Sequence, residues 1–148
     1  LKSIDAGENV RFGVNSFVKG NIKIGSNTYI NGYARIVSGN YSNVTIGENC
    51  AIGRFFSCAA RTHDLRRPTP TANFTSHLQR EDSISIGNSV WIGDHVTIRE
   101  GITIEDFAVI GANSVVLKDV KKFEIVGGVP AKHIRFNTIN FLYNENIN

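Results

Sequence analysis

The chain has 148 residues, with 16 Lys or Arg against 13 Asp or Glu, a formal net charge of +3 and a pI near 9.0. A hydrophobic content of 41% suffices for one core, and no apolar stretch approaches the length of a membrane span. The first residues lack the pattern of a signal peptide, so we expect a cytoplasmic protein. No aromatic-interleaved basic stripe occurs, which argues against a nucleic-acid partner.

From Phe12 onward, an aliphatic or aromatic residue returns every six positions, often followed by Gly, with a small residue at the fifth place. A clear copy is the hexad from Ile46 to Ala51, Ile-Gly-Glu-Asn-Cys-Ala. The returning positions are Val18, Ile24, Ile30, Ile36, Ile46, Ile52, Ile86, Ile92, Ile98, Ile104, Ile110 and Val116. This period is neither helical nor a simple strand alternation. It predicts a solenoid of short strands, with first and fifth residues inward and three hexads in each triangular coil. Gly, Asn and Asp are expected to supply turns with positive φ.

The repeat is interrupted twice. Residues 38–43 read as a small bulging turn, whereas the hexads vanish from about Ser57 to Ser83, a stretch with two prolines and several turn formers. Long loops on a rigid scaffold usually carry function or are disordered. We therefore predict one domain over 1–136 with a loop excursion at about 57–83, followed by an Asn-rich C-terminal tail at 137–148.

The phrases Ser85 to Gly93, Ile110 to Val120 and Gly128-Val129-Pro130-Ala131-Lys132 resemble the hexapeptide-repeat acetyltransferases. The resemblance covers residues 4 to 136 and points to the branch that acetylates sugars and xenobiotics, including maltose, galactoside and capsule enzymes. It implies an all-β, left-handed parallel β-helix, an exception to the usual right-handed crossover. It also implies a homotrimer with active sites between subunits, and transfer of acetyl from acetyl-CoA to a saccharide hydroxyl of a capsule, lipopolysaccharide or related sugar.

His63 is the expected catalytic base. A sugar hydroxyl that attacks a thioester must lose its proton, and neutral imidazole is suited to accept it near pH 7. In the resembled family the catalytic His stands in the corresponding excursion, whereas His77 in the same loop is the second candidate. The partner that orients the imidazole stays open between Asp64, Glu81, Asp82 and a backbone carbonyl.

Trp91, the only tryptophan, stands at the sixth place of its hexad, where the side chain would point outward. An exposed aromatic on a solenoid face indicates a binding wall or a subunit contact. The resemblance implies that Trp91 flanks both the pantetheine arm and the acceptor. Arg61 and Arg66 hint at an acidic acceptor, such as a sialic or uronic acid, although such loops also pair with carboxylates of a neighbouring subunit.

The resemblance also assigns the cofactor contacts to the C-terminal coils. A small residue there lets the pantetheine amide reach the backbone, and cations meet the phosphates, because CoA carries several negative charges. The alternative for these cations is a solvated charged turn. The residues implied besides Trp91 are Ala112, Ser114, Leu117, Lys118, Lys132 and Arg135.

The same residues also suggest two other chemistries. Cys58 lies near His63 and would make a nucleophile–base pair, but direct acetyl transfer needs no covalent intermediate. Zinc held by three His, as in the γ-type carbonic anhydrases, would need a further His soon after His95, and none occurs before His133. No metal is therefore expected.

Three functions remain beside the O-acetyltransferase. Amino-sugar N-acetylation and antibiotic acetylation are enzymatic alternatives within the family. The non-enzymatic alternative is a β-solenoid that binds a surface or partner, although the regular Thr-x-Thr ranks of an ice-binding face are absent.

Overall fold

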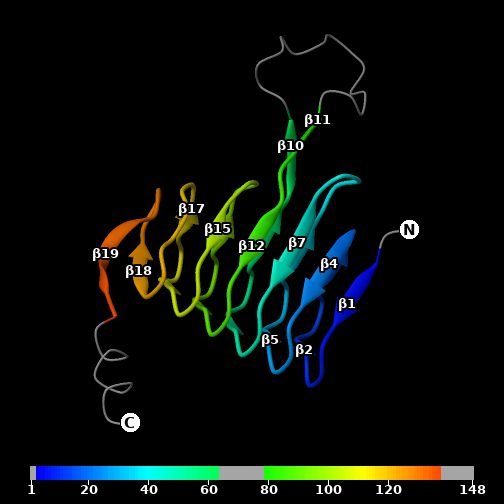
Figure 1. The fold of residues 1–148 in the computed structure, drawn as a ribbon, viewed down its shortest axis with the longest axis horizontal. Helices are drawn as coiled ribbons and strands as arrows, with labels where there is room; N and C mark the ends of the chain where they lie inside the picture. The colour runs from blue at the N-terminus through cyan, green and yellow to red at the C-terminus, as the bar shows by residue number, and fades with distance from the viewer. Residues whose placement is uncertain (1–2, 64–78, 138–148) are drawn as a thin grey trace.

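The computed structural model describes residues 3–63 and 79–137 as a stack of short β-strands, with no helix among these residues (Figure 1). The strands form three parallel faces, which we call A, B and C in the order in which the chain visits them. Face A contains β1 (Ile4–Ala6), β4 (Asn21–Ile24), β7 (Asn43–Ile46), β12 (Ile84–Ile86) and β15 (Thr103–Ile104). Face C contains β3 (Phe17–Lys19), β6 (Arg35–Val37), β9 (Ser57–Ala59), β14 (Thr97–Ile98) and β17 (Val115–Val116).

Face B is the longest. It contains β2 (Arg11–Phe12), β5 (Tyr29–Ile30), β8 (Ala51–Ile52), β13 (Trp91–Ile92), β16 (Val109–Ile110), β18 (Glu124–Gly127) and β19 (Lys132–Phe136). Its pairs are parallel except the last, because β19 folds back antiparallel on β18 at the C-terminal end. The triangular β-helix predicted from the repeat is confirmed. No helix that could cross a membrane occurs in the described parts of the chain.

The core is a set of aliphatic columns along the axis of the solenoid. On face B, Ile52, Ile92 and Ile110 lie in register on successive coils, and each is at most 1% exposed. Fifth-place residues such as Cys50 and Val90 are buried beside them. The first and fifth places therefore point inward, as predicted.

The expectation for the turns was correct only in part. Positive φ falls on the fourth residue of the hexads, including Asn49 at 56° and His95 at 57°, and not on the Gly at the second place. That Gly is needed for space instead, since a Cβ on Gly47 would lie 2.5 Å from the carbonyl oxygen of Gly87 on the next coil. Close stacking of the coils, not turn conformation, selects glycine there.

All insertions occur at the corner between faces C and A, which we call corner CA. A regular coil of three hexads brings Ile4 into register with Ile22. The next two coils are longer, because Ile22 pairs with Val44 and Val44 pairs with Ile84. The first insertion is the bulging turn at 38–42 and the second is the excursion. Because both leave the solenoid at a corner, the three ladders continue past them.

The excursion begins slightly later than the expected position near 57. β9 still pairs in register with β6 and β14, so Cys58 occupies an inward place. The chain then leaves the solenoid through β10 (Arg61–His63) and returns through β11 (Gln79–Glu81), which form an antiparallel hairpin that rises from the prism (Figure 1). The predicted tail, apart from Asn137, lies outside the described residues.

Candidate functional site

His63 lies at the outer end of strand β10, opposite Gln79 of β11, and its side chain is exposed. Arg61 lies at the base of the same hairpin, opposite Glu81. Asp64, Arg66 and His77, which were the other loop candidates, lie outside the described residues. The described part of the excursion therefore presents the predicted base on a two-stranded support.

Hydrogen bonds to the adjacent coils hold the hairpin. The two carboxylate oxygens of Glu81 accept the backbone N–H groups of Asn40 and Tyr41, at 3.0 and 2.6 Å. The Asp82 carboxylate pairs with Arg80 at 3.3 Å, and the Asp82 carbonyl oxygen accepts the N–H of Gly101 at 3.3 Å. Glu81 and Asp82, the two candidates to orient His63 that lie among the described carboxylates, thus have partners of their own.

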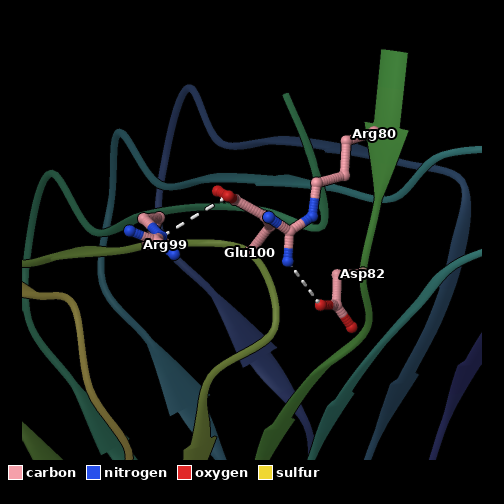
Figure 2. Close-up of polar contacts among 4 residues, drawn as sticks. All are labelled: Arg80, Asp82, Arg99 and Glu100. Carbon is pink, nitrogen blue, oxygen red and sulfur yellow. Dashed lines mark hydrogen bonds and ion pairs between the residues drawn. The ribbon is translucent and has the colours of Figure 1, made fainter. Parts of the chain in front are cut away.

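Figure 2 shows the charged side chains on the excursion side of corner CA. Besides the Arg80–Asp82 pair, it shows a second pair, in which Arg99 Nε lies 3.4 Å from Glu100 Oε1. Arg99 and Glu100 both belong to the following coil. The Glu100 side chain is only 9% exposed, whereas Arg99 is half exposed. The hairpin therefore rises from a corner that carries two local charge pairs and is joined to the adjacent coils by hydrogen bonds to the backbone.

Trp91 projects from face B with 60% of its surface exposed. It lies in register with Ala51, which in turn lies in register with Tyr29, so the small alanine occupies the coil between two aromatic side chains. A pocket of about 320 Å³ is lined by Trp91, Tyr29, Ala51 and Ala112, with polar groups from Asn31 and Asp94. We call it the face B pocket. It brings together Trp91 and Ala112, two of the predicted residues.

The sequence interpretation missed Tyr29, Asn31 and Asp94. Their hexad places gave a signal, since Tyr29 and Trp91 are both sixth-place aromatics. That signal becomes useful only once the coils are aligned, because the insertions at corner CA separate these residues unevenly along the chain.

A second pocket, of about 410 Å³, lies at the C-terminal end of the solenoid, and we call it the C-terminal pocket. Its lining includes Leu117, Lys118 and Lys132, three of the predicted cofactor residues. Arg135 is exposed on the same strand as Lys132 but is not part of this lining. The pocket thus offers two ammonium groups beside apolar surface from Val116 and its neighbours, which suits an anionic ligand with an apolar portion.

The carboxylates in the C-terminal pocket are already engaged by the protein. Asp119 accepts the backbone N–H of Thr103 at 2.7 Å, and Glu124 accepts that of Lys121 at 2.8 Å. The other oxygen of Glu124 lies 2.8 Å from His133 Nδ1. Hydrogen bonds within the protein engage these oxygens, while both carboxylates still add negative charge to the lining of the pocket.

Ser114, another predicted cofactor residue, turns its side chain into the solenoid. It is fully buried, and its hydroxyl donates to the carbonyl of Gly111 at 2.6 Å and accepts the N–H of Gly128 at 3.1 Å. As a fifth-place residue it points into the solenoid and ties β17 to the segment after β18. The structure therefore gives its hydroxyl an internal role.

The hypotheses of a cysteine nucleophile and of a metal site gain no support. Cys58 is 1% exposed, and burial raises the pKa of its thiol to about 12, so it is not a thiolate near neutral pH. His95 stacks on Phe55 with ring centroids 4.5 Å apart, at the corner between faces B and C. Among residues 3–63 and 79–137, no group of three His, Cys, Asp or Glu side chains gathers as metal ligands would.

His63 and Trp91 do not meet within one chain. His63 rises from corner CA, and face B, which carries Trp91, is the side of the triangular prism opposite that corner. A site that uses both residues must therefore combine two copies of the chain.

Comparisons with known proteins agree with this architecture. A family model described as bacterial transferase hexapeptide (six repeats) matches residues 83–118. Galactoside O-acetyltransferase of Escherichia coli is 40% identical over 96 residues, which cover 62% of this chain and 43% of that protein. Chloramphenicol acetyltransferase of Agrobacterium fabrum is 58% identical over 59 residues, covering 40% and 28%. The chain thus spans less than half the length of these curated relatives.

Two solved structures extend the similarity over most of the chain. A hexapeptide-repeat acetyltransferase of Vibrio cholerae in complex with acetyl-CoA has a TM-score of 0.75 and 30% identity, and the match covers 88% of this chain and 69% of that one. A galactoside acetyltransferase in complex with CoA has a TM-score of 0.66 and 32% identity, covering 88% and 67%. The repeat, the three-faced β-helix and these matches together show that the chain belongs to the hexapeptide-repeat acetyltransferase family.

Proposed function

We propose that this protein is an acetyl-CoA-dependent O-acetyltransferase that transfers acetyl to a hydroxyl of a saccharide. The observation that carries the proposal is the pair of pockets on a scaffold similar to acetyltransferases solved with acetyl-CoA or CoA. One pocket offers lysines for phosphates, and the other offers aromatic walls with polar groups.

The C-terminal pocket is assigned to the nucleotide end of acetyl-CoA. Lys118 and Lys132 would bind its phosphates, and the exposed Arg135 on the same strand as Lys132 adds positive charge nearby. Trp91 and Ala112 lie on earlier coils, and the exposed Ala112 leaves room for the pantetheine arm between the two pockets. Leu117 lines the C-terminal pocket and contributes apolar surface.

The face B pocket is assigned to the acceptor and the acetyl end. Aromatic faces pack well against the C–H faces of a pyranose, and a few placed polar groups fix its orientation. Tyr29 and Trp91 supply the faces, while Asn31 and Asp94 supply polar atoms at the edge. His63 of another copy of the chain would complete the site, in keeping with a homotrimer.

The transfer follows from these positions. The saccharide hydroxyl oxygen attacks the thioester carbon of acetyl-CoA while the His63 imidazole accepts the hydroxyl proton. The tetrahedral intermediate then collapses, the C–S bond breaks, and the CoA sulfur leaves and takes up the proton from the imidazolium. The products are the O-acetyl saccharide and CoA with its free thiol, and no covalent enzyme intermediate is formed.

The first experiment measures CoA release from acetyl-CoA with neutral, amino and acidic sugars and chloramphenicol as acceptors. His63→Ala should lower acceptor-dependent release by at least about a hundredfold, while acetyl-CoA still binds in calorimetry. Thr62→Ala is the matched control, because Thr62 is exposed and adjacent on the same strand. Failure of the native chain to bind acetyl-CoA would refute the transferase proposal.

The same panel separates the alternative acceptors. Transfer only to an amino sugar would instead indicate an amino-sugar N-acetyltransferase. Transfer only to chloramphenicol would indicate an antibiotic acetyltransferase. Preference for sialic or uronic acids would support the role of Arg61 and Arg66 in acceptor binding, and Arg61→Gln should then raise the acceptor KM selectively.

A complementation experiment tests the shared site. Chains with His63→Ala and chains with Trp91→Ala should each be nearly inactive, but hybrid oligomers contain some sites with both native residues. Random 1:1 mixing in a trimer makes about a quarter of the sites complete, so about a quarter of the native activity should return. No recovery in mixed oligomers would refute a site built from two copies.

A further inference from the structure

One carboxylate joins the hairpin that carries His63 to the bulging turn of the preceding coil. Glu81 is the last residue of β11 and lies opposite Arg61, at the point where the hairpin joins the solenoid. Its side chain reaches the bulging turn of the preceding coil, where Oε1 accepts the N–H of Asn40 and Oε2 accepts that of Tyr41. The contact joins two segments that are far apart in the sequence, and both oxygens take part in it.

The bulging turn is shaped to receive this carboxylate. Two successive N–H groups point at it, as in backbone anion-binding turns. A Cβ on Gly39 would collide with the carboxyl carbon and both oxygens of Glu81, so the glycine leaves the space that the carboxylate fills. Partial burial by itself raises the pKa of Glu81, but hydrogen bonds from Asn40, Tyr41 and Ser42 outweigh it and lower the pKa, which keeps the group ionised.

Two neighbouring hydrogen bonds lie at the base of the hairpin. Asp82 N–H donates to the carbonyl of Ala60 at 3.1 Å, and Asn43 N–H donates to the Ser83 hydroxyl at 3.0 Å. Both bonds lie where the chain has already returned to the solenoid. The bonds of Glu81, by contrast, connect a residue of the hairpin's own strands directly to the bulging turn.

We propose that Glu81 is a positioning residue, whose bond to the bulging turn sets the orientation of the hairpin and thereby of the His63 imidazole. This inference rests on the proposed function for its kinetic consequence. It explains why the chain keeps a bulge in one coil and the excursion in the next, because the first insertion provides the docking site of the second. Glu81 itself touches no reacting atom.

The primary experiment follows the His63 ring signals by NMR, assigned with His63→Gln, in three variants of the native chain. Glu81→Gln keeps the shape but turns an oxygen into a donor facing an N–H group, and should shift the His63 signals and speed amide exchange at Asn40 and Tyr41. Gly39→Ala should produce the same changes by displacing the carboxylate. Glu105→Gln is the control, since Glu105 accepts the N–H of Lys122 at 2.9 Å at a corner without predicted site residues.

Kinetics then separate positioning from general stability. With the preferred acceptor, Glu81→Gln and Gly39→Ala should each lower kcat about 10- to 100-fold, the effect of displacing a catalytic group by about 1 Å. The Kd of acetyl-CoA should stay within about twofold, because the lining of the C-terminal pocket reaches corner CA at Leu117 to Asp119, two coils beyond the coil of Glu81. Glu105→Gln should leave kcat within about twofold even though it loses a comparable contact.

A double substitution gives the sharpest discrimination. In a Glu81→Ala background the space near Gly39 is empty, so adding Gly39→Ala should lower kcat little further, whereas independent effects would multiply. Unchanged His63 signals in Glu81→Gln, or losses that multiply, would overturn the inference. A native chain that binds no acetyl-CoA would refute the proposed function, and the NMR comparison would still decide whether Glu81 orients the hairpin.

Discussion

Strand β13 offers an internal comparison between core and site, because Trp91 and Ile92 are adjacent and point in opposite directions. Ile92 is fully buried, between Ile52 and Ile110 on the neighbouring coils. The ladder around it is tight, with the N–H of Gly53 donating to the Ile92 carbonyl at 2.8 Å. A cavity left by Ile92→Ala cannot easily collapse, so we expect a loss of about 3–5 kcal/mol in the free energy of unfolding.

The estimate for Trp91 is smaller. With 60% of the residue exposed, the remaining 40% corresponds to roughly 60–100 Å² of aromatic surface, or an upper limit of about 2.5 kcal/mol at 25 cal/mol per Å². The unfolded chain already buries part of that surface, which reduces the expected loss for Trp91→Ala to about 1 kcal/mol. Function should respond in the opposite order, because Trp91→Ala removes a wall of the face B pocket.

Urea unfolding at one fixed protomer concentration measures both losses, since assembly would make stability concentration-dependent. Thr97→Ala and Ile98→Ala on face C form a matched pair, with Thr97 exposed and Ile98 1% exposed. That pair should repeat the difference in stability without a loss of acetyl-CoA binding. If Trp91→Ala destabilises as much as Ile92→Ala, or leaves ligand binding intact, the outward placement of a binding wall is wrong.

Three further outcomes are expected. Lys118→Gln should weaken acetyl-CoA binding about tenfold in calorimetry. Lys23→Gln, a change of an exposed lysine on face A, should leave binding unchanged. Equal Kd values for the two variants would contradict the assignment of the nucleotide to the C-terminal pocket. The buried Cys58 thiol should resist a disulfide reagent at pH 8 until the protein unfolds. Its pKa in the folded protein, about 12, exceeds the ordinary value of 9.0. The stability that comes from burying the neutral thiol is therefore complete below pH 9 and is lost as the pH rises toward 12. Gly47→Ala should cost about 1–3 kcal/mol in urea unfolding, whereas Gly111→Ala, where the nearest atom to a new Cβ is 3.5 Å away, should cost clearly less, and equal losses would refute the stacking argument.

The fold could be predicted from the sequence because its determinants are local and repeated. The inward residues of each hexad can be predicted from that hexad alone. The same first-place isoleucine recurs at Ile46, Ile86 and Ile104, which the structure places in one column. Even an error about glycine did not affect that result, because spatial and conformational reasons for Gly47 both favour the same residue.

The face B pocket could not be predicted in the same way. A regular coil has the length that separates Ile4 from Ile22. One such length before Trp91 the sequence has Asn73, inside the excursion, whereas the residue in register with Trp91 in the structure is Ala51. The alignment of Trp91 with Tyr29 depends on how many residues each insertion adds to its coil outside the strands. That number is a property of the tertiary structure and not of any hexad.

The buried position of Ser114 follows from the local repeat. Its fifth place in the hexad already predicted an inward side chain, as at Cys50 and Val90. The resemblance to the family named Ser114 as a cofactor residue, which stays a prediction, whereas the local pattern correctly indicates where its hydroxyl lies.

The placement of the insertions also limits how this solenoid can become an enzyme. Residues inserted within a strand would break a ladder of backbone hydrogen bonds, whereas a corner insertion leaves all three ladders intact. The excursion satisfies its first backbone groups through its own hairpin of β10 and β11. A group carried by it can reach the solvent around corner CA, but the prism itself separates it from face B of the same chain. If His63 and Trp91 serve one reaction, assembly is therefore a requirement of the catalytic geometry, and dilution below the assembly concentration should abolish transfer while each chain keeps its fold.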